Sequence, residues 1–238
     1  MIEFFPFRTI AFAWGPVAIH WYGIMYAVAF WIAYAVLPHL GKARGLKLHR
    51  DQWTMLIVYG ALGVLIGGRL GYVLFYEPSY FFSHPLELIA IWHGGMSSHG
   101  GFIGVALAVW IWMKKNTVSS LALFDIITVP AAIGLALGRV GNIVNQEFGN
   151  YPYYEALGDM AIAMICYRML CSTKKGFTIS TFLILYSVER FLLEYIRPQE
   201  WPYIAGLTRG QFLTIPIFGI GVLLFLYARA KPRTTRSS

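Results

Sequence analysis

The chain has 238 residues, of which 58% are hydrophobic and 13% charged, and its formal net charge is +8. Soluble domains carry about twice that share of charged residues, so this chain cannot cover a globule of its size with polar surface. The composition excludes a disordered chain and argues against a soluble nucleic-acid-binding protein. Its two cysteines form no disulfide framework and match no metal motif. We expect an all-α integral membrane protein.

Seven apolar segments follow one another, each near the roughly 20 residues that a membrane-spanning helix requires. They are predicted at 18–38, 53–76, 95–113, 121–141, 155–171, 177–196 and 211–229. The third begins in the glycine-rich stretch 94–101, so its start is not expected to be regular helix. Irregular backbone at membrane depth needs protein or a wet cavity around it. We therefore expect one transmembrane domain, 1–238, with a site near that stretch.

The distribution of basic residues predicts the orientation, because lysine and arginine in short loops stay on the cytoplasmic side. Most of them follow the first, third, fifth and seventh segments: Lys42, Arg44, Lys47, Arg50, Lys114, Lys115, Arg168, Lys174, Lys175, Arg229, Lys231, Arg233 and Arg236. The intervening loops hold acids and only Arg197 and Arg209. The N-terminus is therefore predicted outside and the C-terminus in the cytoplasm.

Three arginines, Arg69, Arg139 and Arg190, lie within predicted helices, where a charge costs at least about 2.5 kcal/mol at the bilayer centre. The helix directions place all three toward the outer side, where His99 also opens the third segment. A single arginine near a helix end commonly extends to the interface. Three at one depth, with a histidine, instead predict a cationic cavity that binds a phosphate through paired N–H groups.

Other polar and small residues have plainer interpretations. The glycines of the second segment recur at helical spacing, which is typical of close helix packing. Those beside Arg69 also leave room for a backbone or a lipid headgroup to approach the guanidinium. Asp125, at the inner end of the fourth segment, is expected to contact a helix start or a loop.

Several strings resemble the bacterial prolipoprotein diacylglyceryl transferase family. They are HWYG at 20–23, GGRLGYVL at 67–74, GGMSSHGG at 94–101 and GRVGNIVN at 138–145, followed by Tyr186, Arg190, Glu194, Arg197 and Gln211. The resemblance implies a seven-span enzyme of the bacterial plasma membrane with its active site at the outer leaflet. Such an enzyme moves the diacylglyceryl group of phosphatidylglycerol to the lipobox cysteine of a prolipoprotein. A thioether forms and glycerol phosphate leaves, as the first step of lipoprotein maturation.

The resemblance also implies the residues of the site, with no metal or cofactor. The catalytic set is His99, Arg139, Tyr186 and Arg190. The substrate-binding set is Tyr22, Arg69, Asn142, Asn145, Glu147, Glu194 and Arg197. Within these sets His99 is the candidate base for the thiol, with Tyr186 or Arg190 nearby, while Arg139, Asn142 and Asn145 would bind the headgroup. Whether His99 is the base or a structural donor stays open.

Two departures from the family and two alternative functions accompany this interpretation. The string NQEFG at 145–149 is one residue shorter than its counterpart in the family. The family's larger outer head region is reduced here to about 142–154. A phospholipid-dependent transferase with a different acceptor is the first alternative, and a transporter of an anionic solute is the second. A transporter predicts charges along a path across the membrane, whereas the helical arginines gather on one side.

Overall fold

The computed structural model describes residues 2–7, 9–14, 17–91, 94–118, 120–198 and 203–230. The chain divides into two compact units, which are described separately. The first unit comprises Met1–Lys47 and Leu121–Ser238, and the second is Leu48–Ser120. Three basic residues used to predict the orientation, Lys231, Arg233 and Arg236, lie outside the described residues.

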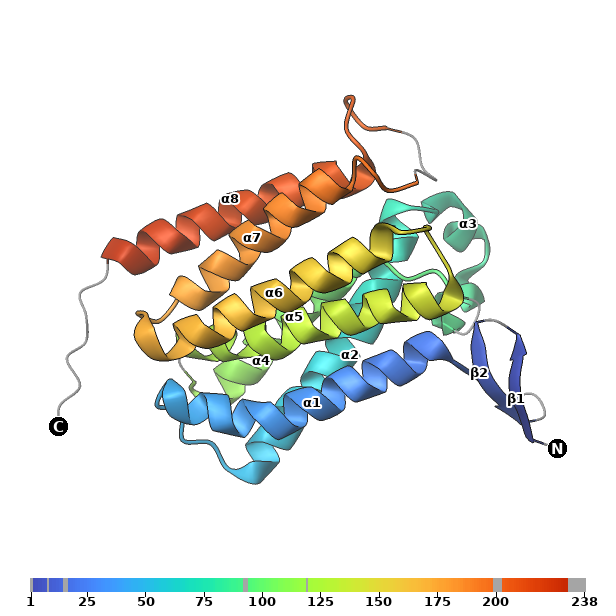
Figure 1. Ribbon diagram of the computed structural model, residues 1–238. Coiled ribbons are helices and arrows are strands. Elements are labelled where there is room, and N and C mark those ends of the chain that lie inside the picture. The colour runs from blue at the N-terminus through green and yellow to red at the C-terminus, as the bar shows by residue number, and fades with distance from the viewer. Residues whose placement is uncertain are drawn as a thin grey trace. The chain divides into compact units, whose positions relative to one another are not determined.

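Each of the seven predicted segments coincides with a long helix (Figure 1). The first unit holds α1 (Trp21–Ala43), α5 (Ser120–Asn145), α6 (Tyr151–Ser172), α7 (Phe177–Leu193) and α8 (Arg209–Ala230). The second holds α2 (Arg50–Phe75), the short α3 (Pro78–Ser83), the 3-10 turn η1 (Pro85–Ile89) and α4 (Ser98–Asn116). Four of these helices, α1, α2, α5 and α8, are long and apolar enough to cross a membrane. The prediction of a helical membrane protein is confirmed at this level.

The N-terminal segment forms a small sheet that the sequence analysis did not predict. Strands β1 (Ile2–Phe7), β2 (Ile10–Trp14) and β3 (Val17–His20) pair antiparallel in that order. Phe12 pairs with Ile19 and Ile10 with His20, so the first helix begins at Trp21 rather than at residue 18. Isoleucine, phenylalanine and tryptophan recur through this stretch, and such residues favour strands. The apolar residues that suggested an earlier start of the first helix therefore form strands of this sheet.

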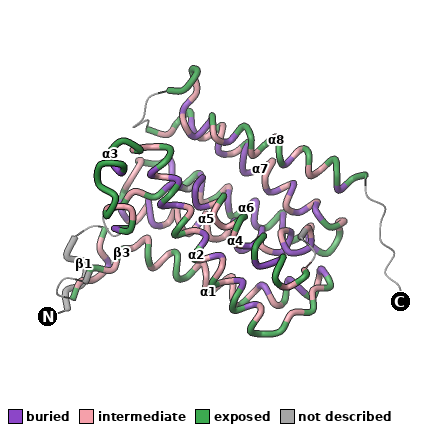
Figure 2. The backbone as a smooth tube through the Cα atoms, turned by 180° about the vertical axis from the view of Figure 1, so that it is seen from behind, coloured by how far each residue is buried: buried purple, intermediate pink, exposed green. Residues whose placement is uncertain are grey.

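The helices carry large apolar side chains on their exposed positions. Leu62, Ile66 and Leu74 on α2, Leu157 on α6 and Leu223 on α8 are all more than half exposed. Exposed and buried stretches alternate along α7 and α8, which lie side by side (Figure 2). Soluble monomers rarely expose contiguous apolar surface on this scale, whereas hydrocarbon tails of a bilayer would cover it.

A buried ion pair contacts the turns at one end of the first unit. The Arg44 guanidinium lies 3.0 Å from an oxygen of Asp125 and donates hydrogen bonds to the Thr173 carbonyl and the Thr178 hydroxyl. Asp125 also accepts backbone N–H groups from Gly176 and Ile179. Burial lowers the pKa of Arg44 below its ordinary value, although the Asp125 carboxylate acts in the opposite direction. Asp125 therefore makes loop contacts, as expected.

Helices α2 and α4 of the second unit pack through glycines, as the spacing predicted. A methyl group at Gly104 would lie 2.1 Å from the Gly63 carbonyl oxygen, and one at Gly67 would lie 2.4 Å from the Gly100 carbonyl oxygen. Neither position has space for a side chain, so the two backbones are in direct contact. Residues Gly94 and Gly95, with φ of +83° and +76°, precede α4 outside regular helix, which confirms the predicted irregular start.

Candidate functional site

A tight chain reversal at the end of α5 creates the main polar cluster of the first unit. Gln146, Phe148 and Gly149 adopt positive φ angles of 53°, 58° and 59°, and α6 begins two residues later. The Glu147 N–H donates to the Asn142 carbonyl, 2.9 Å away, which folds the Glu147 side chain back along α5. Arg139, Asn142 and Asn145 recur every three residues on that helix, so they share one face.

Glu147 is the centre of the first part of this cluster. Its Oε2 accepts the Tyr22 hydroxyl at 2.5 Å and the Asn142 amide at 2.8 Å, while its Oε1 accepts the Asn145 amide at 2.9 Å. Gly141 makes room for the Tyr22 ring, because a methyl group there would lie 2.9 Å from it. The structure thus brings together four of the predicted substrate-binding residues.

The second part of the cluster is a chain of ion pairs around Glu155. This buried carboxylate forms an ion pair with Arg139, whose Nε lies 2.6 Å from it, and also pairs with Arg190. Arg190 donates to the Tyr151 hydroxyl at 2.5 Å and lies 3.2 Å from Glu194. Since Arg139 Nη1 also donates to Asn142, 3.1 Å away, the two parts form one continuous network.

Arg197 continues the network beyond the end of α7. Its guanidinium lies 3.5 Å from Glu194 and 4.8 Å above the centre of the Phe148 ring. Glu194 is held close to the start of α8, because a methyl group at Gly210 would lie 2.5 Å from its Oε2. These contacts join the α5–α6 turn, α7 and α8 at one polar end of the first unit.

Exposure separates the three guanidinium groups of the network. The Arg190 side chain is 5% exposed, against 17% for Arg139 and 24% for Arg197. Tyr186, one turn before Arg190 on α7, is also buried and stacks on Phe182 with ring centres 5.8 Å apart. A ligand approaching the network would therefore meet Arg139 and Arg197 before it met Arg190.

The remaining two predicted site residues, Arg69 and His99, belong to the second unit. Arg69 is buried and donates to five backbone carbonyls, those of Glu87, Leu88, Ala90, Gly94 and Gly95. A guanidinium has five N–H donors, so a headgroup could bind Arg69 only by replacing one of these carbonyls.

His99 lies in the first turn of α4, immediately after the segment that Arg69 holds. Ser97 caps this helix by accepting the Gly100 N–H at 3.2 Å, and its own N–H donates to the Gly68 carbonyl at 2.9 Å. The buried His99 ring is thus positioned by a cap and a loop whose carbonyls converge on Arg69.

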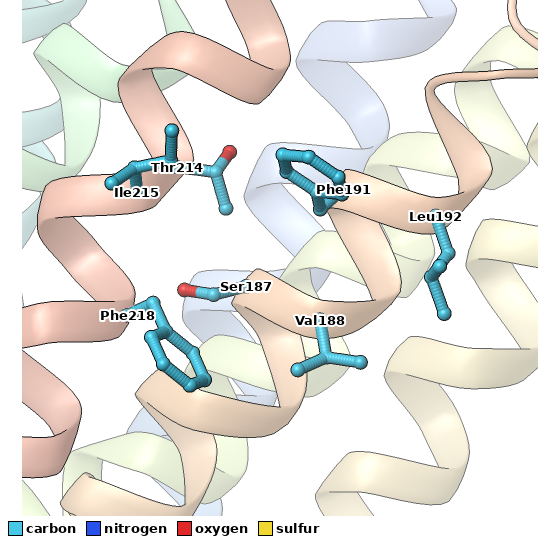
Figure 3. A pocket seen from close by; sticks show the side chains of 7 residues that line it. All are labelled: Ser187, Val188, Phe191, Leu192, Thr214, Ile215 and Phe218. Carbon is cyan, nitrogen blue, oxygen red and sulfur yellow. The ribbon is translucent and has the colours of Figure 1, made fainter.

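A separate groove lies between α7 and α8, with a cavity volume of about 280 Å³. Its lining comprises Ser187, Val188, Phe191, Leu192, Thr214, Ile215 and Phe218. Figure 3 shows Ser187 and Phe191 of α7 pointing toward α8. The lining has two hydroxyls and no charged group, so it suits hydrocarbon rather than an anionic headgroup.

Comparison with known proteins identifies the family. The family profile described as prolipoprotein diacylglyceryl transferase matches residues 9–227. The chain belongs to this family. Proteins named phosphatidylglycerol–prolipoprotein diacylglyceryl transferase are 38% identical in Janthinobacterium sp. (strain Marseille), over 94% of this chain and 96% of the relative, and 37% identical in Bordetella avium (strain 197N), over 98% and 99%. The resemblance drawn from the sequence strings is confirmed.

Four residues in or beside the network were not singled out as site residues from the sequence of this family member. They are Tyr151, Glu155, Asp159 and Glu189. A signal for three of them was present, since Glu155 and Asp159 lie four residues apart in an apolar segment and Glu189 precedes Arg190. Buried carboxylates in such segments are as costly as arginines, and an arginine there requires a counterion.

Proposed function

We propose that this protein transfers the diacylglyceryl group of phosphatidylglycerol to the lipobox cysteine thiol of prolipoproteins. A thioether forms and glycerol phosphate is released. The observation that carries the proposal is the Arg139–Glu155–Arg190 network, present in a chain of this family and reachable through Arg139. A transporter of an anionic solute or a transferase with another acceptor is less favoured, because the relatives are named for this reaction.

The phosphate of the lipid would bind at Arg139 and Arg197. Both guanidinium groups are partly exposed, and the neighbouring Asn142 and Asn145 amides donate hydrogen bonds to Glu147. As the glyceryl C–O bond breaks, charge develops on the departing phosphate, and fixed guanidinium groups stabilise it. Arg190 is fixed by Glu155, Glu194 and Tyr151. Its positive charge would add to the electrostatic stabilisation of the departing phosphate.

The acceptor thiol must lose its proton, since the thiolate is the reactive form. We assign His99 as the residue that faces the thiol, as its base or as a structural hydrogen-bond donor, with Tyr186 beside Arg190. The Arg69 contacts support this role, because they order the segment that leads into the His99 turn. Arg69 would then serve the site by positioning rather than by binding the headgroup.

The site would face the outer leaflet of the bacterial plasma membrane. We propose seven spans, with the N-terminus outside, the C-terminus in the cytoplasm and a single transmembrane domain. The alignments to the two relatives run over 259 and 263 positions, more than the 238 residues of this chain. The relatives therefore carry segments that this chain lacks, and we propose that these belong to an outer region that is reduced here to about 142–154.

A reconstituted assay tests the proposal. Purified protein in detergent is incubated with phosphatidylglycerol and a lipobox peptide, and released glycerol phosphate is measured with the cysteine peptide and with its serine counterpart. We expect release that depends on the cysteine. Release without any peptide dependence would mean that the acceptor is different, and no release would favour the transporter.

A further inference from the structure

Two carboxylates of the first unit lie beside the arginine network without taking part in it. Asp159 follows Glu155 by four residues, so both project from the same face of α6, and Asp159 is 3% exposed. Glu189 directly precedes Arg190 on α7. The two carboxylates interact electrostatically with each other and with Arg139 and Arg190.

Within the described part of the chain, Asp159 and Glu189 lack the arginine ion pairs that Glu155 and Glu194 form. Among the residues that the structure describes, Asp159 Oδ1 and both oxygens of Glu189 are buried and accept no hydrogen bond. Glu155 and Glu194, in contrast, are each paired with two arginines. An ionised carboxylate buried without a donor is costly, so the Asp159–Glu189 pair needs a separate explanation.

The backbone of α6 brings the pair together. A methyl group at Gly158 would lie 1.7 Å from Glu189 Oε1, so the Glu189 carboxylate occupies the space that a side chain at 158 would fill. Asp159 is the next residue on α6 and interacts electrostatically with Glu189, so both carboxylates lie near this contact between α6 and α7. Helices α6 and α7 pack against each other within this unit.

Acidic side chains outnumber the arginines in and beside the network. The carboxylates are Glu147, Glu155, Asp159, Glu189 and Glu194, and the guanidinium groups are Arg139, Arg190, Arg197 and, at the start of α8, Arg209. Five ionised acids against four cations leave one negative charge, and an anionic phosphodiester adds another. Two neighbouring carboxylates with three buried oxygens that accept no hydrogen bond from the described residues disfavour the ionisation of both. Asp159 and Glu189 are the members that fit this description.

We propose that Asp159 and Glu189 share one proton and take up the proton that the substrate thiol loses, an inference that rests on the proposed function. Sulfur bonds to the glyceryl carbon, and the electron pair of the broken C–O bond moves to the phosphate oxygen. The thiol proton passes to the ionised member of the pair, and the protonated member returns one to the departing phosphate. The pair ends with its original single proton, and nothing is oxidised or reduced.

The groups that face the pair decide how it responds to pH. They are Arg139 on α5, Glu155 on α6, and Tyr186 and Arg190 on α7. A pair of this kind titrates in two steps, so activity of the wild type should depend on pH with an optimum between them.

The test measures kcat/KM against pH for the wild type, Asp159→Asn, Glu189→Gln and the double variant. Each single variant should have a kcat/KM lower by about 10²-fold and a flatter pH dependence. The double variant should lose little more activity than either single variant, because the two residues hold the same proton. Asp51→Asn, an exposed acid in the first turn of α2, is the matched control and should behave as wild type.

Infrared spectroscopy gives a second readout that does not depend on activity or on the variants' turnover. The wild type should show a protonated-carboxyl C=O band near neutral pH that is lost in Asp159→Asn or in Glu189→Gln. An unchanged pH profile in active variants, or no such band in the wild type, would overturn the inference. A wild type that shows the band but transfers nothing would instead contradict the proposed function.

Discussion

Arg139 stands where the buried ion pairs meet the accessible part of the network. Its Nε is committed to Glu155 and its Nη1 to Asn142, which fixes the plane of the guanidinium and leaves further N–H groups for a ligand. Arg190 lies deeper and is tied on three sides. Because Arg139 is more exposed than Arg190, we assign Arg139 to binding of the phosphate and Arg190 to electrostatic stabilisation from a fixed position.

Arg139→Gln should lower transferase kcat/KM by about 100-fold or more, because a preorganised charge at the departing phosphate is lost. Arg139→Lys should recover only part of the activity, since a lysine cannot pair with Glu155 and a phosphate through a planar fork. Steady-state kinetics with the lipobox peptide measure both. The control is Arg168→Gln, an exposed arginine near the other end of α6, and equal losses in both variants would contradict the assignment.

The arginines could be predicted from the sequence, whereas their partners could not. Arg139 and Arg190 stand out because each is an isolated charge in an apolar segment. Which acid neutralises each one depends on how α5, α6 and α7 pack, and that packing has no signature in spacing alone. Glu155 therefore emerges as the shared counterion only in three dimensions.

The contact between α2 and α4 is the element on which the second unit depends. Its glycines were predicted to pack closely, and the measured approach leaves no room for a methyl group. Gly104→Ala should therefore lower the free energy of unfolding by about 1–3 kcal/mol, as overpacking does. Thermal unfolding in detergent measures this, with Gly219→Ala on α8, where nothing lies within 4 Å, as the control. Equal stability of the two variants would refute the close contact.

The segment between η1 and α4 depends on one side chain. Arg69 gathers carbonyls from Glu87 through Gly95, and the chain then reaches the Ser97 cap and His99. Arg69→Ala should speed hydrogen exchange across 84–100 and lower kcat/KM by up to about 100-fold through misplacement. Lys114→Ala, an exposed basic residue of the same unit, should change neither. Unchanged exchange in Arg69→Ala would mean that its bonds do not order the segment.

The positions of helices could be predicted from long apolar runs, whereas short apolar stretches did not reveal which secondary structure they form. All seven long helices coincide with predicted segments, because length and composition suffice for them. The N-terminal sheet was missed, since strands of four to six residues in apolar sequence resemble the start of a helix. The turn at 146–149 was also unforeseen, because two of its positive φ angles fall on Gln146 and Phe148 rather than on glycine.

At the scale of the molecule, the first unit carries different groups at its two ends. Basic residues gather at the Arg44, Lys174 and Arg229 end of the first unit, whereas the Arg139 and Arg190 network lies near the turn from α5 to α6. Under the positive-inside rule this asymmetry predicts the orientation. It would place the arginine network toward the outer leaflet and the Arg44–Asp125 pair toward the cytoplasm.

The native cysteines allow the orientation to be tested. Cys171 is exposed near the basic end and Cys166 is buried, so a membrane-impermeant thiol reagent should label Cys171 only after cells are permeabilised. In a Cys171→Ser background, Ser83→Cys, at the exposed end of α3, should be labelled in intact cells. Labelling in the reverse pattern would invert the topology.

The most direct measurement of the central claim is fragment mass spectrometry of a lipobox peptide after incubation with the protein and phosphatidylglycerol. The account predicts a gain of one diacylglyceryl group located on the cysteine sulfur, present with the wild type and lost with Arg139→Gln. A peptide of unchanged mass, or an adduct on any other residue, would contradict it.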